Sequence, residues 1–288
     1  MAIRPFVDRS PILAEHPIDE NATGRSVGVP VVSTARSTID QVRVAGFLAT
    51  GSTGSVHVFD PSSDLGPIFV DDTPMDMADA IERIDDWQDD SGRRPGVLSG
   101  RRTTQRIFSY VRERDVDTLV LPSQLGTGPL GRRRHDRLTA SAPCDVVSVN
   151  GEGRSDDFAS ILVPTAGGPY AGLAIDVAVR IATATDAYID LLHVLPEGAD
   201  EAEEQAANER LADISDRIGR PKTVNPWVLR SDYPADTIVE QSAYYGLTVI
   251  GAPTSGRLKR FFHGSTSREI RREANSLVIA VRTPEIPE

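Results

Sequence analysis

Short apolar runs alternate along this chain with longer segments in which apolar residues recur at helical spacing. Most of the runs are apolar at consecutive positions, which is typical of strands that are covered on both faces. Strands that alternate with helices give right-handed crossovers and a parallel sheet, so the pattern predicts an α/β fold. The predicted strands lie at residues 27–32, 55–59, 96–99, 117–121 and 144–149, and again at 160–165, 190–195, 227–230, 247–250 and 276–281.

The second half of the chain repeats the order of elements in the first half. In the second strand of each half, His57 aligns with His193 and Val58 aligns with Val194. An internal repeat of this length predicts two similar doubly wound units, each with a five-stranded parallel sheet. The predicted helices lie at residues 38–50, 75–89 and 103–114 in the first unit and at 170–183, 199–218 and 234–245 in the second.

The boundaries of the units follow from the stretches that lack periodicity. Residues 1–24 contain several prolines and no pattern, so we expect an extended or disordered segment. A polar, glycine-rich stretch at residues 151–158 is typical of a linker. The first unit is therefore expected at residues 25–150 and the second at residues 159–285.

Composition excludes several classes of protein. Of the residues, 39% are hydrophobic and 25% are charged, as in soluble globular proteins. The formal net charge of −11 argues against nucleic acid as a partner. No run approaches the roughly 20 apolar residues of a membrane span, and the first residues lack the apolar core of a secretory signal. The single cysteine, Cys144, excludes an intramolecular disulfide, and we expect a cytoplasmic location.

The cationic residues are nearly all arginine, since Lys222 and Lys259 are the only lysines. An acidic, lysine-poor surface resembles that of proteins from salt-loving microbes, where salt screens the repulsion between like charges. A coding bias that favours arginine codons explains the same composition equally well.

A glycine loop follows the fourth predicted strand of the second unit. Gly251 and Gly256 open the loop, and Gly264, Ser265 and Thr266 close it before residues 267–274, which have the pattern of a helix. Glycines let the backbone approach a bulky anion, and the free N–H groups at a helix start attract phosphate. Thr266 and Glu269 also have the spacing of a capping box. The loop therefore has the features of a phosphate-binding site.

This loop and the strands beside it resemble the C-terminal signature of the universal stress protein family, Gly, two residues, Gly, nine residues, then Gly-Ser or Gly-Thr. Gly251, Gly264 and Ser265 match the signature, whereas Thr254 stands in place of the middle glycine. The resemblance extends over most of the chain. It implies strand order 3-2-1-4-5 in each unit and an internal pseudo-dimer in which the last strands of the two units pair.

The resemblance also implies an adenine nucleotide, ATP or a relative, with or without Mg²⁺, at the carboxyl ends of the strands of the second unit. Val194 matches the residue whose backbone contacts the base, whereas Ala166 stands where ATP-binding members carry an aspartate. The expected nucleotide-binding residues are Thr165, Ala166, Gly167, Gly168, Val194, Gly251, Thr254, Gly256, Gly264, Ser265 and Thr266.

The first unit carries a degenerate version of this loop. Its glycines are closely spaced, and residues 132–134, all arginine, replace the hydroxyl residues. We interpret this basic run as a solvated surface loop, with an anion site of another kind as the alternative. His57 and His193 are expected to be half-buried strand residues satisfied by hydrogen bonds, because no second ligand stands at metal-site spacing.

These observations predict a stress-response or regulatory protein that binds an adenine nucleotide in its second unit. No nucleophile elbow, Walker sequence or paired carboxylates indicate catalysis, so any nucleotide hydrolysis would be weak. Thr254 and Ala166 favour an alternative, an interaction module without nucleotide that regulates a partner such as a membrane transporter. A homodimer and a separate protein partner both stay open.

Overall fold

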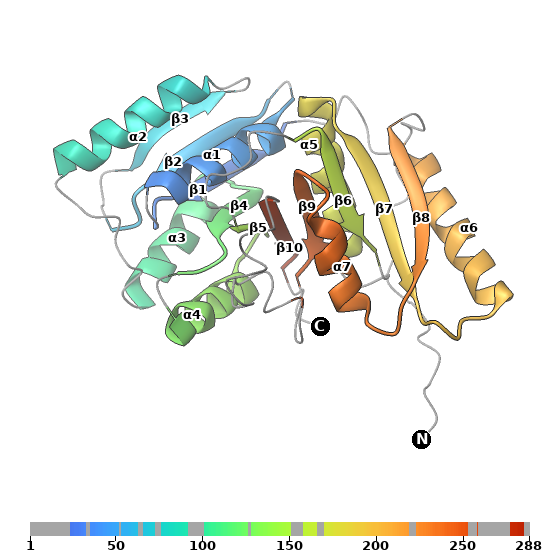
Figure 1. Ribbon diagram of the computed structural model, residues 1–288. Coiled ribbons are helices and arrows are strands. Elements are labelled where there is room, and N and C mark those ends of the chain that lie inside the picture. The colour runs from blue at the N-terminus through green and yellow to red at the C-terminus, as the bar shows by residue number, and fades with distance from the viewer. Residues whose placement is uncertain are drawn as a thin grey trace.

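The chain folds into one ten-stranded sheet with helices on both faces (Figure 1). The computed structural model describes residues 24–32, 35–51, 53–62, 66–72, 76–91, 101–125, 128–150, 158–165, 170–218, 223–252, 258 and 277–284. No helix in these ranges combines the length and the apolar character that a membrane crossing requires.

Strands and helices alternate along most of the described chain, as the hydrophobic pattern predicts. The first half contains β1 (Ser26–Pro30), α1 (Ala35–Ala49), β2 (Ser55–Phe59), β3 (Pro67–Asp72), α2 (Met77–Ser91), α3 (Arg101–Glu113), β4 (Thr118–Pro122), α4 (Gly128–Ser141) and β5 (Asp145–Asn150). The second half contains β6 (Ser160–Pro164), α5 (Ala171–Thr185), β7 (Tyr188–Leu195), α6 (Glu201–Ile218), β8 (Val224–Arg230), α7 (Pro234–Ser242), β9 (Leu247–Gly251) and β10 (Leu277–Arg282).

The order of strands confirms the predicted topology. The sheet runs β3-β2-β1-β4-β5-β10-β9-β6-β7-β8, which is the order 3-2-1-4-5 in each half. The last strands of the two halves, β5 and β10, pair antiparallel from Val278 opposite Asn150 to Arg282 opposite Val146. The two halves therefore form an internal pseudo-dimer that shares one continuous sheet.

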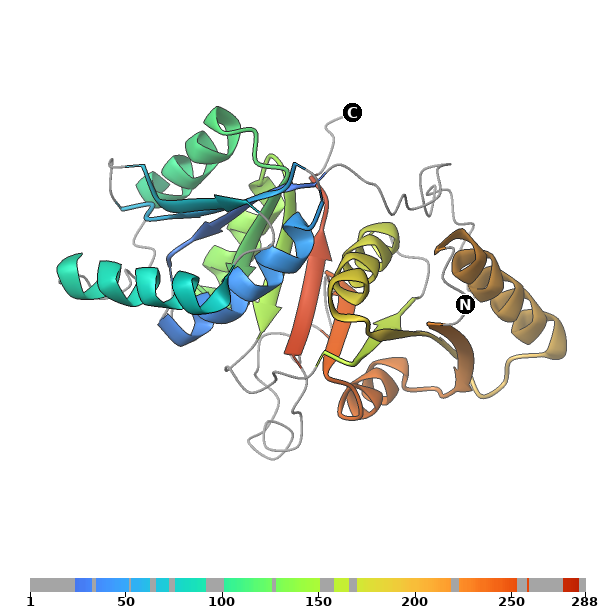
Figure 2. The same cartoon turned by 90° about the horizontal axis from the view of Figure 1, so that it is seen from above.

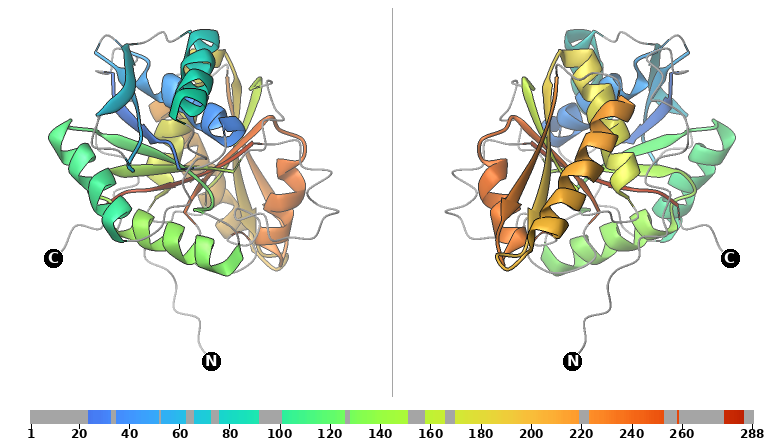
Figure 3. Two further views of the ribbon diagram at one scale, coloured as in Figure 1. Left: turned by 90° about the vertical axis from the view of Figure 1, so that its left-hand side faces the viewer. Right: turned by 90° about the vertical axis from the view of Figure 1, so that its right-hand side faces the viewer.

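The core lies on both faces of the sheet, and strand residues alternate between the faces. In β10, Leu277, Ile279 and Val281 belong to the cluster that α1, α2, α5 and α6 cover. Val278 and Ala280 face the opposite way, toward Val239 of α7. In the first half, α3 and α4 cover that second face. Figures 2 and 3 show the helices on either side of the twisted sheet. Burial on both faces explains why these strands are apolar at consecutive positions.

The third strand of the first half differs from the prediction. The predicted strand at residues 96–99 lies outside the described residues, and β3 occupies the edge position instead. It pairs antiparallel with β2, whereas its counterpart β8 pairs parallel with β7. Antiparallel neighbours need only a short connection, and Asp60 stabilises this one by accepting hydrogen bonds from the backbone and hydroxyl of Ser62. The first half is therefore not an all-parallel unit.

The basic run at residues 132–134 lies in α4 and not in a surface loop, so that interpretation was wrong. Four residues of this segment are buried at the spacing of one helix face: His135, Leu138, Thr139 and Ala142. The Nε2 atom of His135 lies 2.9 Å from the hydroxyl of Ser148 in β5. Two of these four positions carry polar residues, so a count of apolar residues alone does not reveal the helical period.

We predict that the two halves unfold together, because a single buried cluster contains residues of both, such as Val147 and Ile279. Truncation of the fully buried Ile279 to alanine should lower the free energy of unfolding by about 2–5 kcal/mol. The matched change at Val70, which is 43% exposed, should alter it by less than about 0.5 kcal/mol. Urea denaturation measures both effects.

The two tryptophans allow each half to be followed separately. Trp87 lies in α2 of the first half and Trp227 in β8 of the second. Fluorescence of Trp87→Phe therefore reports the second half, and fluorescence of Trp227→Phe reports the first. Ile279→Ala should shift the midpoints reported by both probes by the same amount relative to the matching single-tryptophan parent. Separate transitions for the two probes would contradict a shared core.

Candidate functional site

The predicted nucleotide site lies at the carboxyl ends of β6, β7 and β9, where the strand order of the second half reverses. The strands β9, β6 and β7 are parallel neighbours, so their carboxyl ends meet at one edge of the sheet. Thr165 follows β6, Val194 is the penultimate residue of β7, and Gly251 ends β9. Open α/β sheets bind ligands at such a switch point. The structure therefore gathers three of the predicted residues at one edge.

The other predicted residues lie outside the described ranges. These are Ala166, Gly167, Gly168, Thr254, Gly256, Gly264, Ser265 and Thr266. The predicted contacts of the phosphates therefore remain sequence-based, and the geometry below concerns the edge from which both loops depart.

His193 fixes the backbone at the start of the loop after β6. Its Nδ1 atom lies 2.6 Å from the carbonyl oxygen of Thr165. A carbonyl oxygen can only accept a hydrogen bond, so Nδ1 carries the proton and donates it. The backbone N–H of Thr165 donates in turn to the carbonyl of Leu192 at 2.8 Å. Two hydrogen bonds therefore hold the backbone of Thr165 to β7. His193 is a strand histidine satisfied by a hydrogen bond, as predicted.

Packing against a neighbouring residue favours glycine at Gly251, in addition to the ligand binding that the sequence predicts for this residue. A Cβ atom at this position would lie 3.2 Å from the Cβ atom of Tyr170, the residue before α5. Such a contact is tight, so a side chain here would push the start of α5 away from β9. The guanidinium of Arg282 lies 5.6 Å from the centre of the Tyr170 ring, a cation–π contact that holds Tyr170 from the other side.

Val194 packs in an apolar cluster that sequence reasoning did not assemble. Its neighbours include Trp227 of β8, Tyr245 and Leu258, which lies between Gly256 and Gly264 in the glycine loop. Tyr245 donates its hydroxyl to Asp190, and burial together with this bond raises the pKa of Tyr245. The Nε1 atom of Trp227 is buried and has no hydrogen-bond partner in the described part of the chain. A buried indole N–H without a hydrogen-bond partner lowers the stability of the folded protein, and Trp227 carries such a group beside this edge.

The matching edge of the first half is filled by aromatic side chains. Phe59, the last residue of β2, is 2% exposed and stacks on Tyr110 of α3, with ring centres 3.9 Å apart. Val32, Leu121 and Leu125 belong to the same apolar cluster. Among the described residues, apolar side chains therefore pack at the ends of β1, β2 and β4; that the first unit is degenerate stays a prediction.

His57 is almost fully buried within the first half, and hydrogen bonds satisfy its ring as predicted. Its Nε2 atom lies 3.0 Å from the hydroxyl of Ser55, and its Nδ1 atom lies 3.3 Å from the hydroxyl of Tyr110. Burial lowers the pKa of His57, and the positive charge of Arg114 lowers it further. Within the described residues, no group of three or more His, Cys, Asp or Glu is arranged to hold a metal ion.

Cys144 has the environment of a core residue and not of a nucleophile. It is buried and free, and burial beside the carboxylate of Asp145 raises its pKa to about 12. A thiol with this pKa carries almost no thiolate near neutral pH, so it is a poor nucleophile.

The architecture is that of the doubly wound α/β proteins, with two units joined through their last strands. Residues 158–282 match the model of the universal stress protein family, so the second half of the chain is similar to this family. No curated protein matches the chain.

Two solved structures share the fold over nearly the whole chain. A universal stress protein from Archaeoglobus fulgidus DSM 4304 is 12% identical, covers 91% of this chain and 97% of its own, and has a TM-score of 0.52. The cytoplasmic domain of a prokaryotic cation chloride cotransporter is 15% identical, covers 90% of this chain and 96% of its own, and has a TM-score of 0.56. At these identities the likeness shows the common fold.

We predict that His57 makes the stability of the protein depend on pH. Its folded-state pKa is lowered, so the unfolded chain binds the proton more readily, and protonation favours unfolding. The stability that neutral His57 contributes is present above the unfolded-state pKa of about 6.5 and is lost as the pH falls below it. Urea denaturation between about pH 8 and pH 5 should therefore show a smaller loss for His57→Gln than for wild type. A constant difference between the two proteins across this range would contradict the assignment.

Proposed function

We propose that the protein is a cytoplasmic stress-response protein that binds ATP or a related adenine nucleotide in its second half. The observation that carries the proposal is the meeting of Thr165, Val194 and Gly251 at the switch point of the half that matches the family. Two glycine-containing loops leave the sheet at this edge, one after Thr165 and one after Gly251. Loops of this kind favour close approach of a phosphate chain.

Each residue set has a distinct part in the proposed site. Thr165 and residues 166–168 frame the nucleoside, and Val194 lies beside the base. Gly251, Thr254, Gly256, Gly264, Ser265 and Thr266 hold the phosphates, with Mg²⁺ as an optional counter-ion. The bond from His193 to the Thr165 carbonyl supports this assignment, because it fixes the backbone of Thr165 before a ligand arrives. We propose no catalytic residue.

ATP should bind with one molecule per chain. At a concentration 100 times its dissociation constant, ATP stabilises the folded protein by about 2.7 kcal/mol, a rise in Tm on the order of 5 °C. Isothermal titration gives the stoichiometry, and Trp227 fluorescence in Trp87→Phe reports binding near Val194. Gly264→Arg should abolish binding, since a side chain replaces the glycine of the phosphate loop. Ala206→Arg adds the same charge on the exposed side of α6 and should bind like wild type.

The proposal fails if wild-type protein gives neither heat nor a Tm shift with ATP, in the presence and absence of Mg²⁺. It also fails if Gly264→Arg remains folded by circular dichroism and binds as tightly as wild type. Two nucleotides per chain would mean that the aromatic packing of Phe59 and Tyr110 does not close the first half.

A second candidate function has one observation in its favour. The fold of this chain occurs over 96% of the cytoplasmic domain of a cation chloride cotransporter, so a paired unit of this kind also serves as part of a transporter. Under this alternative the chain is an interaction module that regulates a membrane transporter. Thr254 and Ala166, which depart from the nucleotide-binding pattern, are consistent with it.

The second candidate predicts that nucleotide-free protein captures one integral membrane protein in a fixed ratio from detergent-solubilised membranes of its own cell. Gly264→Arg should capture it equally well, because the partner does not depend on the nucleotide site. Capture that requires ATP would instead make the nucleotide site the controlling element and would exclude the nucleotide-independent module.

A further inference from the structure

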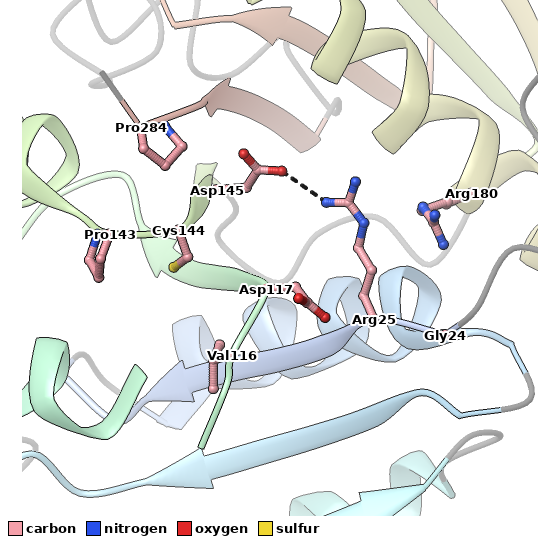
Figure 4. Close-up of a pocket in the computed structure, with 9 residues that line it drawn as sticks. All are labelled: Gly24, Arg25, Val116, Asp117, Pro143, Cys144, Asp145, Arg180 and Pro284. Carbon is pink, nitrogen blue, oxygen red and sulfur yellow. Dashed lines mark hydrogen bonds and ion pairs between the residues drawn. The ribbon is translucent and has the colours of Figure 1, made fainter. Parts of the chain in front are cut away.

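A cavity of about 530 Å³ lies at the junction of the two halves, and none of the residues predicted to bind nucleotide lines it. It lies where the starts of β1, β4 and β5 meet α5 and the residues after β10 (Figure 4). These segments meet because β10 runs antiparallel to β5, so the end of one strand lies beside the start of the other. The volume lies in the range of small-molecule sites.

Two arginines reach this cavity, and they differ in how fully they are engaged. The guanidinium of Arg25 donates to Asp145 at 3.1 Å, to Asp176 at 2.7 Å and to the hydroxyl of Thr118. Arg180 uses only its Nε atom, which lies 3.3 Å from Asp176. Neither terminal NH2 group of Arg180 has a partner within the described residues. Arg180 therefore keeps the planar fork that recognises a carboxylate.

Two carboxylates that line the same cavity also retain binding capacity. Asp117 accepts the backbone N–H of Ser26 with Oδ2 at 2.9 Å, and Asp145 accepts Arg25 with Oδ2. The Oδ1 atoms of both have no hydrogen-bond partner among the residues that the structure describes. With Asp176 included, three carboxylates face two guanidinium groups, which leaves one net negative charge.

The fold does not impose this polar cavity, because the pseudo-symmetric position is apolar and filled. Phe158 lies two residues before β6, as Gly24 does before β1, and packs edge-on against Phe47 with ring centres 5.3 Å apart. Three charged lining residues differ in the same direction. Asp117, Asp145 and Arg180 correspond by position in their elements to Gly246, Leu277 and Val44.

We propose that this cavity binds a basic amino acid, with its carboxylate on Arg180 and its two cationic groups on Asp117 and Asp145. One free guanidinium fork and two half-free carboxylates match one anionic and two cationic groups. The net charge of such a ligand also cancels the excess negative charge of the cavity. The site is separate from the proposed nucleotide site and does not rest on it.

Burial makes a further cation favourable at Asp145. Desolvation is the main cause that raises the pKa of this carboxyl group, and the charge of Arg25 opposes it only in part. Asp176 and Asp117 raise the pKa further. An ammonium or guanidinium group beside Asp145 therefore removes an unfavourable interaction that the protein alone leaves in place.

Isothermal titration with L-lysine and L-arginine tests the proposal, with cadaverine as the probe that lacks the carboxylate. Wild-type protein should bind the amino acids at one per chain, about tenfold or more tighter than cadaverine. Arg180→Gln should remove this preference. Asp117→Asn should weaken lysine and cadaverine alike, while its amide oxygen can still accept the N–H of Ser26. Asp213→Asn, on the exposed side of α6, makes the same charge change and should bind like wild type.

No saturable heat with either amino acid overturns the proposal, as does equal binding of lysine and cadaverine by wild type. Lysine binding that is as tight in a folded Asp117→Asn variant as in wild type also overturns it. The Gly264→Arg variant separates this site from the proposed nucleotide site. Lysine should bind to this variant as tightly as to wild type, whether or not either protein binds ATP. Loss of lysine binding in Gly264→Arg would place the amino acid in the glycine loop and overturn the assignment to the junction.

Discussion

The antiparallel pairing of β5 with β10 is the interaction on which the rest of the architecture depends. It joins two five-stranded sheets into one, and it gives the strands of each half a neighbour where an exposed sheet edge would otherwise lie. It also sets which segments meet across the junction. Because the strands are antiparallel, the end of β10 lies beside the start of β5, and α1 and α5 lie against each other on one face of the sheet.

Within this frame, equivalent positions of the two halves carry different chemistry. The carboxyl edge of the first half is closed by Phe59 and Tyr110, whereas the second half keeps Thr165 and Gly251 at its edge. At the junction the difference is reversed, since Phe158 fills one position and a cavity lined by Asp117 and Arg180 occupies the other. A duplicated fold supplies two copies of each location, and side chains decide which copy is open to a ligand.

The sequence predicts the topology well because the fold is repeated. Two runs of strand and helix in the same order, with one loop that resembles a known family, are enough to place β5 beside β10. The edge strand β3 was missed because three apolar residues, Ile68, Phe69 and Val70, are a weak pattern next to an acidic helix. The helix α4 was missed because His135 and Thr139 occupy buried positions, which an apolar period does not register.

Only part of the candidate site can be predicted from the sequence. A motif names the glycines, but the reason for Gly251 that the structure gives is a contact with Tyr170 made by folding. The role of His193 likewise depends on the position of the Thr165 carbonyl across two strands. The junction cavity could not be predicted from any segment, because its charged residues lie in or directly before four separate elements that only the β5–β10 pairing brings together.

The helix α5 links the proposed nucleotide site and the proposed amino-acid site. Tyr170, just before its first turn, contacts Gly251 at the carboxyl edge, and Asp176 and Arg180 lie farther along the same helix at the junction. Asp176 also binds Arg25 of the first half, so α5 is held from both halves at once. A continuous helix moves as a unit, and a ligand that shifted its start would alter the position of Arg180. By thermodynamic reciprocity, a ligand on Arg180 would then change the affinity at the carboxyl edge by the same factor.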